Sequence, residues 1–347
     1  MPRLLFLNWR DPWHPQSGGA ELVTLRVAEG LIEKGWSVEW FSAIYQGASP
    51  AELRNGINFV RAGSQYTVHF EAFRFYGVSP PFDYVVDGIN TIPFFTPLYC
   101  RIPKIAFFHQ LAREVWFYET PFPANVAGYF AEPIYLRPYR NMPIIAVSDS
   151  TAESLRAIGL AGPISVIPLG VDEPPEPNVP LKDANKNIAV LCRLSPSKRI
   201  EECIKGAAIM VKGGWNGTLF IMGSGNSGYH EKLEKLVTSY NLNARVRLLG
   251  RVSNAERTSR LQDASAIWMT SIREGWGLVI TEAARHATPA VVYNVPGLRD
   301  SVMHNVTGFV VEARPDELAR ATLRLFGLPH QQMCFSALEN SRQRTWR

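Results

Sequence analysis

The chain alternates short, almost uninterrupted apolar runs with segments that have a helical pattern. The runs expected as strands in the first half are residues 4–7, 38–41, 84–86, 105–108, 144–147 and 165–167. Those expected in the second half are residues 188–192, 218–222, 246–249, 266–269, 290–293 and 309–311. Continuously apolar strands are typical of parallel sheets that helices cover on both faces. The pattern therefore predicts an α/β fold built on parallel sheets.

A proline-rich stretch divides this pattern in two. Residues 174–180 contain four prolines, which suit neither a helix interior nor a central strand. We therefore expect a linker over residues 171–187. It would join two doubly wound, Rossmann-like domains, residues 1–170 and 188–328, that face each other across a cleft at the carboxyl ends of their strands. For the last segment, residues 329–347, packing back on the first domain is one alternative, and a truncated C-terminal helix is the other.

Charge is divided unevenly between the two halves. The chain has a net charge of +5, and residues 1–170 contain 13 Lys and Arg against 14 Asp and Glu, which leaves 23 against 17 for the remainder. A basic second domain suits an anionic ligand. Nucleic acid is disfavoured, because the chain has neither a block of basic residues nor the zinc-ligand spacing of nucleic-acid-binding modules.

The cysteines and the apolar runs bear on location. The four cysteines, Cys100, Cys192, Cys203 and Cys334, show no C-x-x-C or other metal-ligand spacing. We therefore expect free thiols in a reducing compartment. No uncharged apolar run reaches the roughly 18 residues of a membrane-spanning helix, and the N-terminal run is expected as a strand because it is too short for a signal peptide. These features predict a cytoplasmic protein and leave open a peripheral contact at the inner face of a membrane.

Two glutamates eight positions apart flank a glycine-rich turn. Residues 274–282 read E-G-W-G-L-V-I-T-E; they follow the strand at 266–269, and a helix is expected over 279–286. Glycines let the backbone approach a ligand closely, and the free amide groups at the start of a helix face an anion. Because carboxylates repel phosphate, Glu274 and Glu282 suit hydroxyl groups. The turn therefore predicts a ligand with both phosphate and polyol, such as a nucleotide sugar.

Two cations follow the first strand of the second domain. Arg193 and Lys198 lie in R-L-S-P-S-K-R, directly after residues 188–192. On one turn they can bind one diphosphate, and each charge-assisted hydrogen bond contributes roughly 1.5–3 kcal/mol. A solvated charge pair is the alternative.

A glycine-rich turn also follows the second strand of this domain. Residues 223–228 read G-S-G-N-S-G, which matches the G-x-G-x-x-G pattern of dinucleotide-binding proteins. Its position argues against that function, because the next strand is bordered by Arg247 and Arg251 rather than by an acidic residue for a ribose. We therefore expect Gly223 and Gly225 to permit a close approach of the backbone.

These motifs together resemble those of the retaining glycosyltransferases of GT-B fold, family 4. The resemblance rests on the two spaced glutamates, the Arg–Lys turn and the G-x-G turn, on S-G-G at 17–19 and on His109 after the strand at 105–108. It covers residues 18 to about 309. It implies that His109 contacts the donor sugar, and that the Gly18-Gly19 loop reaches the donor phosphate or the acceptor.

The resemblance also implies the residues of the site. The catalytic residues would be Arg193, Lys198, Glu274 and His109. The donor-binding residues would be Gly18, Gly19, Gly223, Gly225, Arg251, Gly275, Trp276, Gly277, Leu278 and Glu282. No metal ligand is expected, and no cofactor other than the nucleotide-diphosphate sugar that serves as substrate.

The implied activity is the retaining transfer of a hexose from a nucleotide-diphosphate sugar to a hydroxyl of a glycan, a lipid-linked sugar or a small molecule. No D-x-D sequence occurs, so a Mg²⁺-diphosphate site is not evident, and front-face displacement without a metal is expected. A nucleotide-sugar epimerase of the same fold, a nicotinamide oxidoreductase and a non-catalytic sugar- or nucleotide-binding protein are the alternatives. The sequence does not determine the base, the sugar, the acceptor or the oligomeric state.

One aromatic stretch interrupts the strand–helix pattern. Residues 115–139 contain eight aromatic residues and four prolines, and Arg113, Arg137 and Arg140 flank or interrupt them. A core helix with a packed loop is one interpretation. The other is an apolar surface for a lipid-linked acceptor or a membrane.

Overall fold

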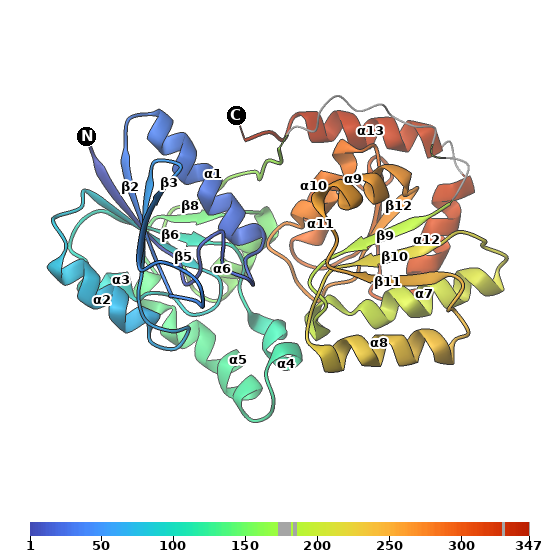
Figure 1. Cartoon of the computed structure of the whole chain (residues 1–347), viewed down its shortest axis with the longest axis horizontal. Helices are drawn as coiled ribbons and strands as arrows, with labels where there is room; N and C mark the ends of the chain where they lie inside the picture. Colours follow the sequence, from blue (N-terminus) through green and yellow to red (C-terminus); the bar gives the residue numbers. More distant parts are fainter. Residues whose placement is uncertain (173–181, 183–185, 328–329, 347) are drawn as a thin grey trace. The chain divides into compact units, whose positions relative to one another are not determined.

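The computed structural model describes residues 1–172, 182, 186–327 and 330–346. The chain forms two compact units, and both are α/β, as the sequence predicts (Figure 1). The first contains Met1–Arg113 and Ala127–Ile167, and the second contains Glu114–Val126 and Pro168–Arg347. The segment Glu114–Val126 therefore belongs to the second unit, although the sequence predicts one domain over 1–170. Most of the expected linker, and the expected domain boundary at 328–329, lie outside the described residues.

The first unit is built on an eight-stranded sheet with the order β3-β4-β2-β1-β5-β6-β7-β8. Its strands are β1 (Arg3–Leu7), β2 (Ser37–Ser42), β3 (Ala51–Arg54), β4 (Ile57–Arg61), β5 (Tyr84–Ile89), β6 (Lys104–Phe108), β7 (Ile144–Ala146) and β8 (Ile164–Val166). All neighbours are parallel except β3 and β4. These two strands are absent from the sequence prediction. They form a hairpin through Asn55 and Gly56, which both have positive φ, as a tight hairpin turn requires.

Helices cover both faces of this sheet. They are α1 (Gly19–Glu33), α2 (Val68–Val78), α3 (Thr96–Tyr99), α5 (Ala124–Tyr135), which begins in the second unit, η2 (Arg137–Tyr139) and α6 (Asp149–Ala157). Figure 1 shows α1 on one face, with α2 and α5 on the other. The core on the α2 side contains Leu5, Leu7 and Phe41. These side chains alternate along their strands with others that face α1, so the sheet is buried on both sides.

The second unit is built on a six-stranded, fully parallel sheet with the order β11-β10-β9-β12-β13-β14. The strands are β9 (Ile188–Leu191), β10 (Leu219–Met222), β11 (Val246–Gly250), β12 (Ala266–Met269), β13 (Ala290–Tyr293) and β14 (Gly308–Val311). All six are within two residues of the predicted bounds. The helices are η1 (Arg113–Val115), α4 (Trp116–Glu119), η3 (Pro196–Lys198), α7 (Ile200–Lys212), α8 (Ser227–Ser239), α9 (Asn254–Asp263), α10 (Leu278–Arg285), α11 (Leu298–Ser301), α12 (Pro315–Gly327) and α13 (His330–Arg342). η1 begins at the last residue of the first unit.

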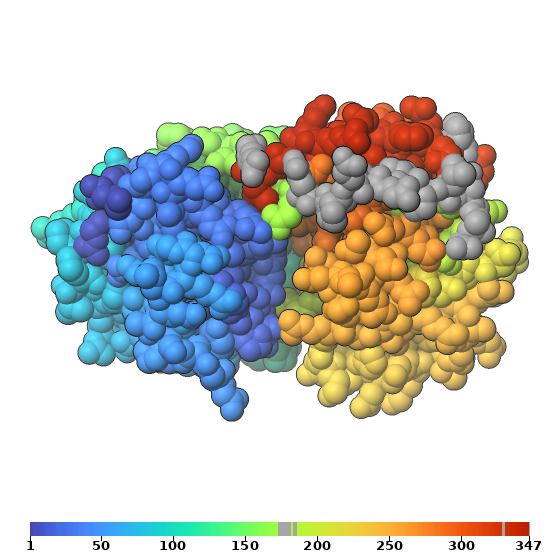
Figure 2. Space-filling view, turned by 45° about the horizontal axis from the view of Figure 1, so that its top comes forward, coloured from blue at the N-terminus to red at the C-terminus, as the bar shows by residue number. Residues whose placement is uncertain are grey.

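The C-terminal segment packs on the second unit. Cys334 and Leu338 of α13 are buried against Ala287, at the end of α10, and Val171 pairs with Thr345 in an isolated bridge. Figure 2 shows the red C-terminal segment lying over the orange surface of that unit. The described residues of this segment therefore belong to the second unit, and packing back on the first domain stays a prediction. The apolar face of α13 packs against α10.

No helix in the described part of the chain is long and apolar enough to cross a membrane. The cysteines, all described, are free thiols, and three of the four are buried.

Candidate functional site

The residues expected to bind a donor follow neighbouring strands of the second sheet. Arg193 follows β9, Gly223 follows β10, and Arg251 follows β11. Glu274 lies in the loop after β12. The strands are parallel, so all these loops leave the same edge of the sheet. The chain order reverses between β9 and β12, and such a switch point is where ligands bind to open α/β sheets.

Lys198 and Glu274 meet at this switch point. Lys198 Nζ donates to Glu274 Oε1 over 2.5 Å, and Ser271 Oγ donates to the same oxygen over 2.6 Å. The side chains of Lys198 and Glu274 are 19% and 13% exposed, so both are largely shielded yet reach solvent. Thr270 Oγ1 donates to the carbonyl oxygen of Lys198 over 2.9 Å, which fixes the end of η3. The structure thus brings together a cation expected at a diphosphate and a carboxylate expected at a sugar.

Gly223 and Gly225 lie where two segments of the backbone approach each other closely. A Cβ atom at Gly223 would lie 1.8 Å from the carbonyl oxygen of Cys192, and one at Gly225 would lie 1.9 Å from that of Leu194. Leu194 and Gly225 form an isolated parallel bridge. The close approach is therefore to the protein's own backbone. Its effect is to hold the loop that follows Arg193 against the turn after β10.

Arg193 and Arg251 lie at the edges of this turn. Both are exposed, and the amide of Gly223 donates to the carbonyl oxygen of Gly250, the residue before Arg251, over 2.7 Å. Arg193, which follows β9, and Arg251, which follows β11, therefore lie on either side of the G-x-G turn that follows β10.

The turn between Glu274 and α10 has the geometry of a helix start. Gly277 is the N-cap of α10 with φ of 91°, a conformation that favours glycine, and Gly275 and Leu278 flank it, half-buried. The first amide groups of a helix have no partner within the helix. Trp276 lies between Gly275 and Gly277 in this turn. Its side chain is buried, its indole Nε1 donates to Thr281 Oγ1 over 3.0 Å, and Arg344 stacks on its face.

Glu282 is the fifth residue of α10, a little more than one turn from the start of the helix. Its Oε1 is 2.9 Å from Arg257 Nε of α9. Desolvation raises the pKa of the Glu282 carboxyl, and the charge of Asp172 adds to the rise, although Arg257 opposes it. Glu282 is thus a partly shielded carboxylate with the Arg257 guanidinium beside it.

The remaining expected residues lie in the first unit. Gly18 and Gly19 are exposed where α1 begins, and the amide of Gly18 donates to Glu21 Oε2 over 2.7 Å. His109 follows β6 and is buried; its Nε2 lies 3.2 Å from Thr24 Oγ1 of α1. Burial lowers the pKa of His109 to about 3, so the imidazole is neutral. His109 therefore suits hydrogen bonding rather than charge.

The neutral state of His109 predicts a pH-dependent stability. An exposed histidine has a pKa of about 6.5, so between pH 6.5 and 3 the unfolded chain binds a proton that folded His109 does not. The neutral state of His109 therefore contributes fully to the free energy of unfolding only above pH 6.5. As the pH falls from 7 to 5, this contribution decreases by about 2 kcal/mol. Urea unfolding at both pH values should show a shallower pH dependence for His109→Gln. Equal slopes for the two proteins would contradict a buried neutral imidazole.

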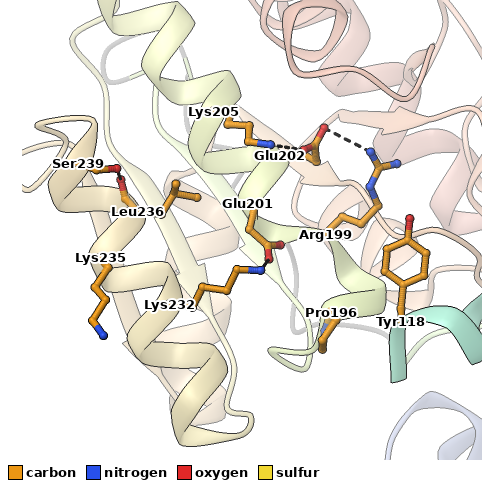
Figure 3. A pocket seen from close by; sticks show the side chains of 10 residues that line it. All are labelled: Tyr118, Pro196, Arg199, Glu201, Glu202, Lys205, Lys232, Lys235, Leu236 and Ser239. Carbon is orange, nitrogen blue, oxygen red and sulfur yellow. Dashed lines mark hydrogen bonds and ion pairs between the residues drawn. The ribbon is translucent and has the colours of Figure 1, made fainter. Parts of the chain in front are cut away.

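A cavity of about 640 Å³ lies elsewhere on the second unit, between α7 and α8. Figure 3 shows that its charged side chains pair with each other: Lys232 with Glu201, and Lys205 and Arg199 with Glu202. None of the expected site residues lines it. Because its cations are mostly neutralised, this cavity is a poor candidate for the diphosphate site.

Sequence reasoning missed several residues that touch the site. Ser271 binds Glu274, Arg257 pairs with Glu282, and Glu119 accepts hydrogen bonds from Ser197 beside Lys198. Ser271 lies two residues after a strand, which is a usable signal. Arg257 and Glu119 lie on helices with no local motif, so only the fold reveals them.

Comparison with known proteins identifies the family to which this chain belongs. The model described as "Glycosyltransferase Family 4" matches residues 17–173, and "Glycosyl transferases group 1" matches residues 173–343. An uncharacterized glycosyltransferase of Methanocaldococcus jannaschii is 26% identical, over 91% of this chain and 87% of its own. GDP-mannose:cellobiosyl-diphosphopolyprenol alpha-mannosyltransferase of Komagataeibacter xylinus is 24% identical, over 61% of this chain and 51% of its own.

The fold matches that of a sucrose-phosphate synthase from Thermosynechococcus elongatus. The TM-score is 0.82 at 19% identity, over 100% of this chain and 96% of that one. The two family models together span nearly the whole chain. The chain therefore belongs to the group 1 glycosyltransferases of GT-B fold, enzymes that transfer a sugar from a nucleotide sugar.

Proposed function

We propose that this enzyme transfers a hexose from a nucleotide-diphosphate sugar to an acceptor hydroxyl, with retention at the anomeric carbon and without a metal ion. The observation that carries the proposal is the Lys198–Glu274 contact at the switch point of the second sheet. A diphosphate and the sugar attached to it are adjacent in the donor. A cation and a hydroxyl-binding carboxylate in contact match that adjacency.

The residues support a front-face displacement. The anomeric carbon–oxygen bond to the diphosphate breaks while the acceptor oxygen bonds to the same face, and the leaving phosphate oxygen takes the acceptor proton. Lys198, Arg193 and the start of α10 would stabilise the negative charge that develops on the diphosphate, which is usually the largest contribution to catalysis. Neutral His109 and the Gly18-Gly19 loop would contact the transferred sugar and the acceptor.

A panel of UDP-, GDP-, ADP- and dTDP-sugars tests the proposal. Nucleotide release should require both one of these donors and an acceptor, and should persist in EDTA. Donor isomerisation without acceptor would favour the epimerase. A change in nicotinamide absorbance would favour the oxidoreductase, and binding without turnover the non-catalytic protein. An anomeric product of inverted configuration would refute retention.

The two glutamates should differ in what they recognise. Glu282→Gln is expected to weaken nucleoside diphosphate binding about tenfold, because Glu282 would hold the ribose diol present in that ligand. Glu274→Gln should change that affinity less than about threefold but impair binding of the whole donor. Calorimetry measures both, with Glu256→Gln as the control, at a glutamate on α9 whose side chain is 43% exposed. Equal losses of nucleoside diphosphate affinity would show that these roles are wrong.

The acceptor is proposed to be lipid-linked. Part of the aromatic stretch is core, since Tyr139 is buried and Tyr135 half-buried, but Phe130 is 66% exposed on α5. On the same side of the first unit, α2 exposes Phe70 and Phe73 (Figure 1). Ring contacts connect these helices through α3: Phe73 with Tyr99, and Phe95 with Tyr135. The name of the Komagataeibacter relative specifies a polyprenol-linked acceptor, which agrees with this proposal.

The exposed apolar residues predict binding to an anionic membrane. Arg74 on α2 and Arg137 and Arg140 after the end of α5 are exposed, and each would contribute about 1 kcal/mol near such a surface. The protein should co-sediment with phosphatidylglycerol vesicles at low salt but not with phosphatidylcholine vesicles. Phe70→Ser and Phe130→Ser should each weaken binding about tenfold, since burying a phenylalanine contributes roughly 1.5–3 kcal/mol. Phe335→Ser, at an exposed site on α13, is the matched control. Wild type that stays in the supernatant would favour a soluble acceptor.

A further inference from the structure

The segment Glu114–Glu119 leaves the first half of the chain to pack on the second unit. It contains the end of η1 and all of α4, and it belongs to the second unit although residues 1–113 and 127–167 form the first. The segment carries two carboxylates, Glu114 and Glu119. Each carboxylate contacts one of the two loops that carry Lys198 and Glu274.

Glu119 contacts the loop after β9. Its Oε1 accepts a hydrogen bond from the amide of Ser197 over 3.2 Å and a second from Ser197 Oγ. Ser197 immediately precedes Lys198. Desolvation alone would raise the pKa of Glu119, but the hydrogen bonds from Ser197 and Ser195 and the charge of Arg193 lower it overall. The carboxylate is therefore ionised at neutral pH and stabilises the turn between the two expected diphosphate ligands.

Glu114 contacts the loop after β12. Its Oε2 accepts from Arg273 Nε over 2.9 Å, and the Arg273 side chain is only 10% exposed. Arg273 immediately precedes Glu274. The two loops are also joined directly, because the amide of Ile272 donates to the carbonyl oxygen of Ser197 over 2.8 Å. The segment therefore contacts both loops one residue before each expected ligand.

We propose that Glu119 and Glu114 are positioning residues, which hold the two loops at the separation that a diphosphate and its attached sugar require. This inference rests on the donor site proposed above. Loops without regular secondary structure sample more conformations than strands and helices do. Fixing them before the donor arrives lowers the ordering cost of binding, and so raises affinity for the part of the donor that the loops contact.

The inference predicts a selective loss of affinity. Glu119→Ala should weaken binding of nucleoside diphosphate about tenfold, the size expected for losing hydrogen bonds to a charged group. Binding of the corresponding nucleoside should change less than about twofold, because in the proposed donor site the ribose would contact Glu282 on α10 and not these loops. Glu119→Gln should retain affinity within about threefold, since an amide oxygen still accepts from Ser197. If Glu119 only stabilised the fold, Glu119→Ala would weaken the binding of nucleoside diphosphate and of nucleoside to the same extent.

Calorimetry with UDP, GDP and their nucleosides tests this on the full chain, with the urea midpoint of each variant as a check on folding. Glu234→Ala, at an exposed glutamate on α8, is the matched control. Ser197→Ala removes the partner instead and should reproduce part of the loss if Glu119→Ala does not fold. If wild type binds nucleoside diphosphate, and Glu119→Ala and Ser197→Ala bind it with the same affinity, the inference is wrong but the proposed donor site is not. Wild type that binds none of the nucleoside diphosphates would overturn the proposed donor site, and the inference with it.

Discussion

Replacing Lys198 by alanine is expected to lower kcat by about 10²–10³, because one preorganised donor to the leaving diphosphate is lost. The fold should remain, since the Lys198 side chain contacts solvent and its backbone is held through Thr270. Glu274 keeps its hydrogen bond from Ser271 in the variant, so its carboxylate stays partnered. Initial rates of nucleotide release under saturating donor give the comparison.

Arg193→Ala should show a similar loss, and the double variant should lose less than the product of the two single effects. Both cations address one diphosphate, and groups that share a partner are not additive. Lys205→Ala is the matched control, because Lys205 is paired with Glu202 away from the site. Activity of either single variant within about threefold of wild type would exclude that residue as a diphosphate ligand.

The second large effect is expected at Gly223, as a loss of stability rather than of rate. Its φ is +139°, which side chains rarely adopt, and an added Cβ would lie 1.8 Å from the carbonyl oxygen of Cys192. Backbone strain and overpacking each cost about 1–3 kcal/mol, so Gly223→Ala should lower the free energy of unfolding by about 3 kcal/mol. Urea unfolding measures it.

Gly250→Ala is the control for this prediction. Gly250 also has a positive φ, of 65°, but no atom lies within 4 Å of the place where its Cβ would be. Gly250→Ala therefore introduces backbone strain but no steric clash, and should lower the free energy of unfolding by about 1 kcal/mol. Equal costs at the two glycines would show that the contact with the backbone after β9 contributes nothing.

The sequence predicted most of the sheet because buried parallel strands are continuous apolar runs. Each strand of the second unit could therefore be placed within two residues, and the residues that follow these strands had to lie at one edge. The hairpin of β3 and β4 escaped prediction because β3 is mostly exposed and has no apolar run. Its Asn55-Gly56 turn was the available signal.

What sequence reasoning could not predict depends on contacts between distant positions. Glu119 and Ser197 are 78 residues apart, and no spacing rule connects them. Trp276 is expected at the donor by resemblance, and no local pattern indicates that its indole is buried and donates to Thr281. The glycines of the G-x-G turn are needed because another backbone segment of the protein lies against them. The same sequence pattern would arise if a ligand lay there, so the sequence does not distinguish the two causes.

The path of the segment Glu114–Glu119 limits how this enzyme can be recombined with its relatives. A chimera joined at residues 173–181 would supply Glu114 and Glu119 from one parent, and Ser197 and Arg273 from the other. Exchanging donor specificity between relatives would therefore require residues 114–126 to travel with the C-terminal half. Over evolutionary time the same constraint should make substitutions at 114 and 273 occur together.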